Sequence, residues 1–143
     1  MNEYSEKAFT GKLEFLSNFY PARIVMGDLV FPTSEHLYNF MKMDTEEGRA
    51  AILSADTPLK AKRLSKKFHV REDWDAVKVN VMREVVGMKF NQHPELMAKL
   101  KKVKGQITEV NYWNDTFWGV CNGEGLNHLG KILMALRDGR TED

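Results

Sequence analysis

The sequence predicts a compact α+β fold, a single domain over residues 1–143 that is mostly helical with a small N-terminal β region. Two observations lead to this fold class. Helix-start signals recur in the first half of the chain, and apolar residues recur at helical spacing after residue 73. Strand-like patterns are short and few. A chain of 143 residues is also long enough to bury one hydrophobic core without disulfides.

The β region begins with a predicted hairpin. Residues 22–25 and 29–31 flank Met26-Gly27-Asp28, and a glycine suits the tight turn of a hairpin. A further strand is expected over residues 105–111, where Ile107 and Val110 are the apolar anchors.

Three helix starts follow the hairpin. Thr33 or Ser34 is the expected N-cap of the first helix. The second start, residues 44–47, has a capping-box pattern with an acid at the third helical position. The third start, residues 56–58, places a proline in the first turn, where proline is favoured.

Three more helices are expected in the second half. The longest covers residues 73–90 and is apolar around much of its circumference, which predicts burial on most sides. Pro94 opens a short helix that runs to residue 103. Leucines and isoleucine at helical spacing predict a last helix that Gly139 ends.

Composition excludes several classes of protein. The single Cys121 allows no internal disulfide and suits a reducing cytoplasm. Residues 1–7 lack the basic and apolar regions of a secretory signal, and no apolar run is long enough to span a bilayer. We therefore expect a cytoplasmic protein without membrane contact. The histidines show no metal-ligand spacing, so no metal site is expected; they are His36, His69, His93 and His128.

Basic residues gather in two segments although the net charge is only +1. The first segment contains Lys60, Lys62, Arg63, Lys66 and Lys67. The second contains Lys99, Lys101, Lys102 and Lys104. Each is either a solvated helix face or a surface that attracts phosphate, nucleotide or nucleic acid. The first segment is the candidate contact with DNA.

One row of three polar residues and three single residues allow both a structural and a chemical interpretation. Glu35, Asn39 and Lys42 fall at i, i+4 and i+7, in one row that faces either solvent or a cleft. Trp74 either fills the core or stacks a heteroaromatic base. Asp115 either forms an Asx-turn or supplies a second carboxylate. Asn18 either satisfies backbone groups or binds a sugar hydroxyl.

Four motifs, in order, resemble one family. They are Phe15-Leu-Ser-Asn-Phe-Tyr20; Ser34-Glu-His-x-Tyr-x-x-x-Lys42; Asp73-Trp-x-x-x-Lys-x-x-x-Met82 with Lys89-Phe90; and Asp115-x-x-Trp-Gly119 with Gly125-x-Asn-x-Leu-Gly-x-x-Leu-Met-x-x-Arg137. Together they resemble the NADAR, or YbiA-like, N-glycosidases. The resemblance implies a compact α+β fold and cofactor-free hydrolysis of N-glycosidic bonds. Some members act on ribosylaminopyrimidine phosphates of riboflavin biosynthesis, and others remove ADP-ribose from guanine, including guanine in DNA.

The resemblance also implies a site. Its catalytic residues are Glu35, Asp115, Trp74 and Lys42, and its substrate-binding residues are Asn18, Phe19, Trp118, Gly119 and Asn127. Glu35 and Asp115 would be the acid/base carboxylates. Lys42 would either neutralise phosphate or attack an open-chain sugar aldehyde to form an imine. Residues 65–71 lack the family's usual Gly-Arg pair and are basic instead.

These features lead to one preferred function and two alternatives. The preferred function is a monomeric enzyme that removes ADP-ribose from guanine, free or linked to nucleic acid. The first alternative is a non-catalytic module that binds ADP-ribose or a related nucleotide. The second is a small nucleic-acid-binding protein that uses the basic segments and does not depend on Glu35 or Asp115.

Overall fold

The computed structural model describes residues 9–140, so residues 1–7, considered above for a secretory signal, lie outside the described residues. Contacts divide the chain into two compact units. The central unit is Asn18–Gln92, and the terminal unit joins Met1–Ser17 to His93–Asp143. Each unit is described by itself, and the single domain over residues 1–143 stays a prediction. Within the described range, no helix is both long and apolar enough to cross a membrane.

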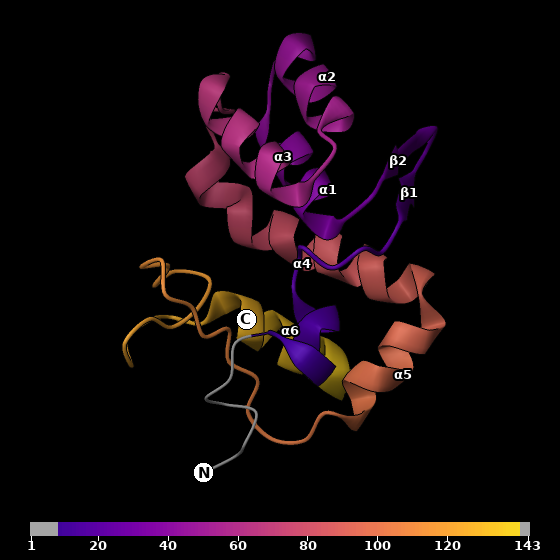
Figure 1. Ribbon diagram of the computed structural model, residues 1–143, viewed down its shortest axis with the longest axis vertical. Helices are drawn as coiled ribbons and strands as arrows, with labels where there is room; N and C mark the ends of the chain where they lie inside the picture. Colours follow the sequence, from indigo (N-terminus) through magenta and orange to yellow (C-terminus); the bar gives the residue numbers. More distant parts are fainter. Residues whose placement is uncertain (1–8, 141–143) are drawn as a thin grey trace. The chain divides into compact units, whose positions relative to one another are not determined.

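The central unit opens with a two-stranded antiparallel hairpin (Figure 1). Strand β1 (Ile24–Met26) pairs with β2 (Leu29–Phe31), with Ile24 opposite Phe31. Gly27 has a φ of 60°, in the left-handed region that glycine adopts without strain. The predicted hairpin and its turn are therefore confirmed.

Four α-helices complete the central unit: α1 (Ser34–Lys42), α2 (Glu46–Ser54), α3 (Pro58–Leu64) and α4 (Trp74–Gln92), with a short 3-10 turn η2 (Ser65–Lys67) after α3. Thr33, Thr45 and Thr57 cap the first three helices, each accepting a hydrogen bond from the backbone N–H three residues later. A threonine oxygen at this position satisfies a donor that the helix itself leaves open. The capping-box prediction for α2 is wrong in one respect, because Gly48 occupies the third helical position.

Helix α1 is the centre of this unit and packs against α2, α3 and α4. His36 explains part of that packing. Its Nε2 lies 2.9 Å from the carbonyl oxygen of Ala55 and must donate to it, since a carbonyl can only accept, and its Nδ1 lies 2.8 Å from the Thr33 hydroxyl oxygen. His36 is fully buried, and it ties the start of α1 to the end of α2.

The terminal unit contains a 3-10 turn, η1 (Gly11–Leu16), and two helices, α5 (Pro94–Lys102) and α6 (His128–Asp138). Helix α5 packs on α6. The left-handed Gly139 ends α6, as the sequence predicts. With mostly helices and one small N-terminal sheet, the described chain has the predicted α+β fold.

The strand predicted over residues 105–111 is wrong. This segment has only an isolated bridge, between Val110 and Val120. Its backbone is instead held by a side chain: Asn127 accepts from the N–H of Glu109 at 3.0 Å and donates to the carbonyl of Ile107 at 2.9 Å. Once an amide side chain satisfies the buried backbone groups, a strand partner is not needed.

Candidate functional site

The polar row on α1 is partly buried rather than fully exposed to solvent. Asn39 is buried, and Glu35 and Lys42 are half-buried. The amide of Asn39 donates to the Oε2 and the backbone oxygen of Glu35, each at 2.8 Å. Asn39 was part of the predicted row but not of the predicted site, and it fixes the orientation of the Glu35 carboxylate.

The backbone of Glu35 is fixed as well. Its N–H donates to the carbonyl of Asn18 at 3.0 Å. The Asn18 side chain is buried, and its Oδ1 accepts from the hydroxyl of Ser34 at 2.8 Å. The Asn18 amide group also donates to the sulfur of Met82 at 3.4 Å, so both ends of its side chain contact other side chains rather than backbone groups. Asn18 anchors the first turn of α1 through its backbone carbonyl and its Oδ1, and its proposed contact with a sugar hydroxyl stays a prediction. Phe19 beside it is 38% exposed.

Lys42 lies at the other end of the row, in the last turn of α1. Desolvation is the main effect that lowers the pKa of Lys42, and Glu35 opposes it by electrostatic attraction. Lys66 and Lys78 lower the pKa further by repulsion, while Asp75 raises it. Lys42 thus lies among charged groups from α1, η2 and α4. The site prediction did not include Lys66, Lys78 or Asp75.

Trp74 begins α4 and is only 8% exposed. Its ring packs on Tyr38 of α1, with centroids 5.1 Å apart and planes tilted by 57°. The core-packing interpretation of Trp74 fits these contacts. Its proposed stacking on a base stays a prediction.

In the terminal unit, Asp115 forms the Asx-turn that the sequence allowed. Its Oδ1 accepts from the N–H groups of Phe117 and Trp118, at 3.1 and 2.9 Å. The side chain of Asn111 binds the backbone of Asp115 at both its N–H and its carbonyl. It accepts from the N–H at 3.1 Å and donates to the carbonyl at 2.8 Å. The turn holds the half-buried Asp115 carboxylate in a defined position.

An aromatic cluster follows this turn. The rings of Phe117 and Trp118 lie edge to face at 4.8 Å, and His128 lies 4.6 Å from Phe117. The N–H of Leu129 donates to the carbonyl of Trp118 at 3.0 Å. Trp118 is therefore coupled to the first turn of α6.

Gly119 and Asn127 have structural roles. A Cβ on Gly119 would lie 2.2 Å from the carbonyl oxygen of Glu109, so no larger residue fits. Asn127 has a φ of 54°, and its side chain forms hydrogen bonds with the backbone of residues 107 and 109. It does not cap α6 with that side chain. Their proposed contacts with substrate stay predictions.

Gly130 on α6 has the same steric restriction and allows a sharp test. Its Cβ would lie 2.2 Å from the carbonyl oxygen of Ile107. We expect Gly130→Ala to lower the free energy of unfolding by about 3 kcal/mol, because the new methyl group would force the backbone at Ile107 or at residue 130 to move. Gly87→Ala is the control: no atom lies within 4 Å of its Cβ, so it should stabilise α4 by about 0.5–1 kcal/mol. Urea denaturation measures both, and equal stability of Gly130→Ala and the wild type would contradict the packing described here.

The predicted site residues divide between the two units. Glu35, Lys42, Trp74, Asn18 and Phe19 belong to the central unit. Asp115, Trp118, Gly119 and Asn127 belong to the terminal unit. Contacts within each unit position the site residues of that unit. The pairing of the Glu35 and Asp115 carboxylates stays a prediction.

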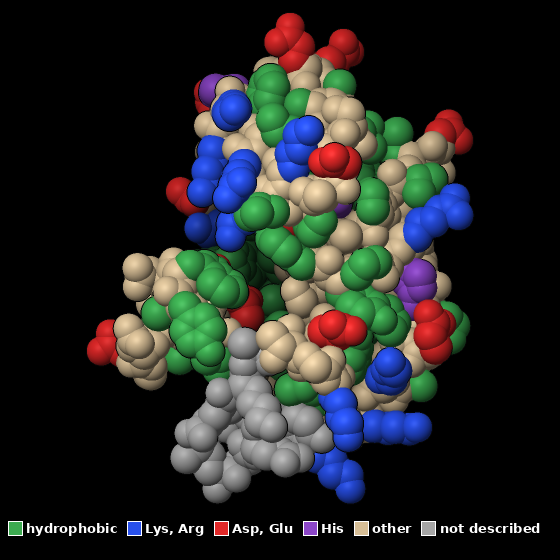
Figure 2. Space-filling view, viewed as in Figure 1, with side chains coloured by type: hydrophobic (Ala, Val, Ile, Leu, Met, Phe, Trp, Pro, Cys, Tyr) green, Lys and Arg blue, Asp and Glu red, His purple; other side chains and the backbone are tan. Residues whose placement is uncertain are grey.

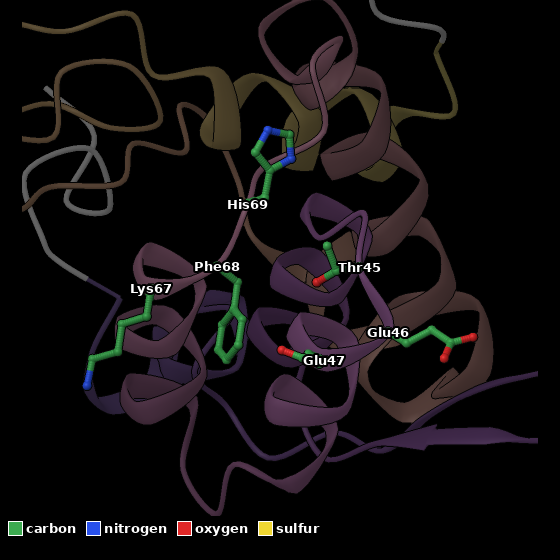
Figure 3. Close-up of a pocket in the computed structure, with 6 residues that line it drawn as sticks. All are labelled: Thr45, Glu46, Glu47, Lys67, Phe68 and His69. Carbon is green, nitrogen blue, oxygen red and sulfur yellow. The ribbon is translucent and has the colours of Figure 1, made fainter.

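Two open pockets are lined by other residues, although the second adjoins the Asx-turn at Asp115. One, of about 600 Å³, lies in the central unit between the start of α2 and the segment after η2 (Figure 3). It is lined by Thr45, Glu46, Glu47, Lys67, Phe68 and His69. The other, of about 410 Å³, is lined by residues 116, 117 and 124–126 of the terminal unit. In the described part of the chain, no three His, Cys, Asp or Glu side chains gather to hold a metal ion.

Comparison with known protein families assigns this mostly helical chain to one of them. The model of the NADAR domain matches residues 5–139, and this chain belongs to the NADAR family.

Named relatives agree with that assignment. An N-glycosidase of Nostoc punctiforme is 38% identical over 85% of this chain and 82% of its own length. The N-glycosidase YbiA of Escherichia coli is 35% identical over 85% of this chain and 78% of its own length. A riboflavin biosynthesis protein of Vibrio vulnificus is 36% identical over 87% of this chain, but this chain spans only 35% of its length. The NMR structure of E. coli YbiA matches with a TM-score of 0.82 and 32% identity, over 97% of this chain and 86% of YbiA.

Proposed function

We propose that this chain is an N-glycosidase that hydrolyses a ribosyl C1′–N bond and that it removes ADP-ribose from guanine, either free or in DNA. The observation that carries the proposal is the partly buried polar row on α1. A half-buried carboxylate, Glu35, is held by the amide of Asn39, and the Lys42 amine of lowered pKa lies near it. The names of the relatives, N-glycosidase among them, support the reaction class.

The chemistry of the bond explains why such a row is useful. Breaking a C1′–N bond develops positive charge on the sugar, which a nearby carboxylate stabilises. The departing base takes a proton from a positioned acid, and water supplies the oxygen that ends on C1′. We assign these tasks to Glu35 and Asp115 together, because two carboxylates in different surroundings can hold different protonation states.

A second substrate class is favoured by a specific observation. Relatives from Vibrio vulnificus and maize have names in riboflavin biosynthesis. The corresponding reaction would be hydrolysis of a ribosylaminopyrimidine phosphate, which also has a ribosyl C1′–N bond.

A mass-spectrometric hydrolysis panel tests the proposal. It contains guanine-linked ADP-ribose, free and in an oligonucleotide, and a ribosylaminopyrimidine phosphate. We expect release of guanine from the free compound and of the unmodified oligonucleotide from the DNA-linked compound. Release from the pyrimidine alone would support the second substrate class. Tight nucleotide binding without any product would instead support the non-catalytic module and overturn the enzyme.

A further inference from the structure

A two-residue hairpin in the terminal unit presents Glu124 on the loop between α5 and α6. The N–H of Cys121 donates to the carbonyl of Glu124 at 2.9 Å, and the N–H of Glu124 donates to the carbonyl of Cys121 at 3.1 Å. Between them, Asn122 and Gly123 have φ values of 53° and 78°, the left-handed conformation that such a turn requires at both central positions. Both backbone hydrogen-bonding groups of Glu124 are therefore fixed.

The residues that follow this hairpin are fixed as well. Gly125 has a φ of 152°, and a Cβ there would lie 2.1 Å from the carbonyl oxygen of Gly119, so only glycine fits. The N–H of Leu126 donates to the carbonyl of Thr116 at 2.7 Å. This hydrogen bond joins the hairpin to the segment that contains the Asx-turn.

The two joined segments line the pocket of about 410 Å³ in the terminal unit, a volume within the range of small-molecule sites. Phe117 contributes a half-buried aromatic ring, which packs edge to face on Trp118 with centroids 4.8 Å apart. Glu124 contributes a carboxylate to the same pocket. In the described part of the chain, this carboxylate forms no ion pair. The pocket thus combines an aromatic ring with a carboxylate that no cation of the chain neutralises.

This combination suits a neutral heteroaromatic base better than a phosphate. The sequence contains no lysine or arginine between residues 105 and 130, and hydrophobic side chains are exposed on this loop (Figure 2). An ionised carboxylate only accepts hydrogen bonds. Guanine presents two adjacent donors, its ring N1–H and its exocyclic amine, whereas adenine presents one donor beside an acceptor. The carboxylate therefore favours guanine among the purines.

We infer that Glu124 and Phe117 form a subsite for the guanine base of the substrate. The Glu124 carboxylate accepts from the N1–H and the amine, and the Phe117 ring packs on the base. The inference rests on the proposed function and deepens it, because it assigns the groups that recognise the base. The pocket adjoins the Asx-turn, so a base held there lies next to the turn that positions Asp115. An aminopyrimidine with an adjacent ring N–H presents the same two donors.

Nucleotide binding to the full chain tests the subsite without turnover. Guanosine 5′-monophosphate presents both donors, the inosine form lacks the amine, and the adenosine form lacks the ring N–H. NMR titration follows the backbone amides of residues 116, 117 and 124–126. We expect the guanosine form to bind best and Glu124→Gln to weaken its binding about tenfold, since a hydrogen bond to a charged group is worth at least that factor.

Glu84→Gln is the matched control, because Glu84 is exposed on α4 and its loss removes the same charge. It should bind all three nucleotides as the wild type does. Glu124 is itself exposed, so Glu124→Gln should fold normally.

Substrate kinetics provide the second readout. Glu124→Gln should raise KM about tenfold and leave kcat unchanged, because a contact to the base is made equally in the ground state and the transition state. The guanine-linked compounds and the ribosylaminopyrimidine phosphate are assayed side by side. The substrate whose KM rises is the one whose base occupies the subsite.

The outcomes separate this inference from the proposed function. Weaker binding of the guanosine form by Glu124→Gln than by Glu84→Gln supports the subsite even if no substrate is cleaved, a result that would sink only the proposed function. No shift with the guanosine form, equal binding of all three nucleotides, or shifts confined to other residues overturns the subsite. A fall in kcat with KM unchanged also overturns it and assigns Glu124 to the chemical step. A response to methylguanidine alone overturns it as well, and assigns the pocket to an arginine side chain of a partner protein.

Discussion

Replacing Glu35 by glutamine should reduce kcat for ribosyl–base hydrolysis by about 10²–10⁴-fold, the usual contribution of one positioned acid or base. Glutamine keeps the volume and an oxygen acceptor, so the hydrogen bond from Asn39 can persist. The charge is lost, and with it the stabilisation of the developing sugar cation. Single-turnover product release measured by mass spectrometry gives the rate, and circular dichroism confirms that the variant is folded.

Glu47→Gln is the matched control for this substitution. Glu35 and Glu47 both occupy the second position of a helix, α1 and α2 respectively, so each substitution removes the same favourable interaction with the helix dipole. Glu47 is exposed. Its variant should therefore keep the wild-type rate. A Glu35→Gln enzyme that keeps its kcat would exclude Glu35 from the chemistry.

Asp115→Asn extends the same experiment to the second carboxylate. Asparagine can still accept the backbone hydrogen bonds from residues 117 and 118, so the Asx-turn should survive. A loss of kcat comparable to that of Glu35→Gln would support two cooperating carboxylates. An unchanged rate would restrict Asp115 to its role in the turn.

The second large effect concerns Lys89, whose side chain is 1% exposed on α4. Its ammonium lies 5.1 Å from the ring centroid of Phe90 and 5.7 Å from that of Tyr20. Burial lowers the pKa of Lys89 to about 7. In an unfolded chain the pKa of a lysine is about 10.4, so between these values the unfolded state binds one more proton than the native state.

Stability should therefore rise with pH between about 7 and 10, by up to about 1.4 kcal/mol per pH unit. Below pH 7 Lys89 is protonated in both the native and the unfolded state. The buried charge then lowers the free energy of unfolding by its full amount. Lys89→Met should remove this contribution, so its free energy of unfolding should exceed that of the wild type by several kcal/mol at pH 7 and converge with it near pH 10. Urea denaturation across this range measures the difference.

Lys101→Met provides the reference for that measurement, because Lys101 is exposed on α5. Its pH dependence should match the wild type. If Lys89→Met and the wild type show the same slope, Lys89 is already charged in the native protein at alkaline pH, held by its two aromatic neighbours.

The elements predicted correctly are those whose signals are local. Thr33, Thr45 and Thr57 each lie within three residues of the N–H group they accept from, so the sequence contains the whole capping interaction. The hairpin turn at Gly27 is equally local. The strand expected at residues 105–111 was wrong because its partner is the side chain of Asn127, about twenty residues away.

The same distinction applies to the candidate site. The spacing of Glu35, Asn39 and Lys42 identified one row, but only the packing of α1 shows that the row is partly buried. The influence of Lys66 and Lys78 on Lys42 depends on three elements meeting, which no spacing rule contains. The burial of Lys89 was missed for a related reason, since a lysine within an apolar helix is ordinarily expected to reach solvent.

The loop around the Asx-turn has a consequence for how such proteins can diversify. Its backbone is fixed by three polar side chains, those of Asn111, Asp115 and Asn127. Tyr112 and Leu126 are exposed and bear none of those hydrogen bonds. Tolerance to substitution therefore differs within this one loop. Asn111, Asp115 and Asn127 permit almost no replacement, whereas the exposed residues between them can be replaced. New specificities can arise on such a surface without any rebuilding of the framework that holds the carboxylate.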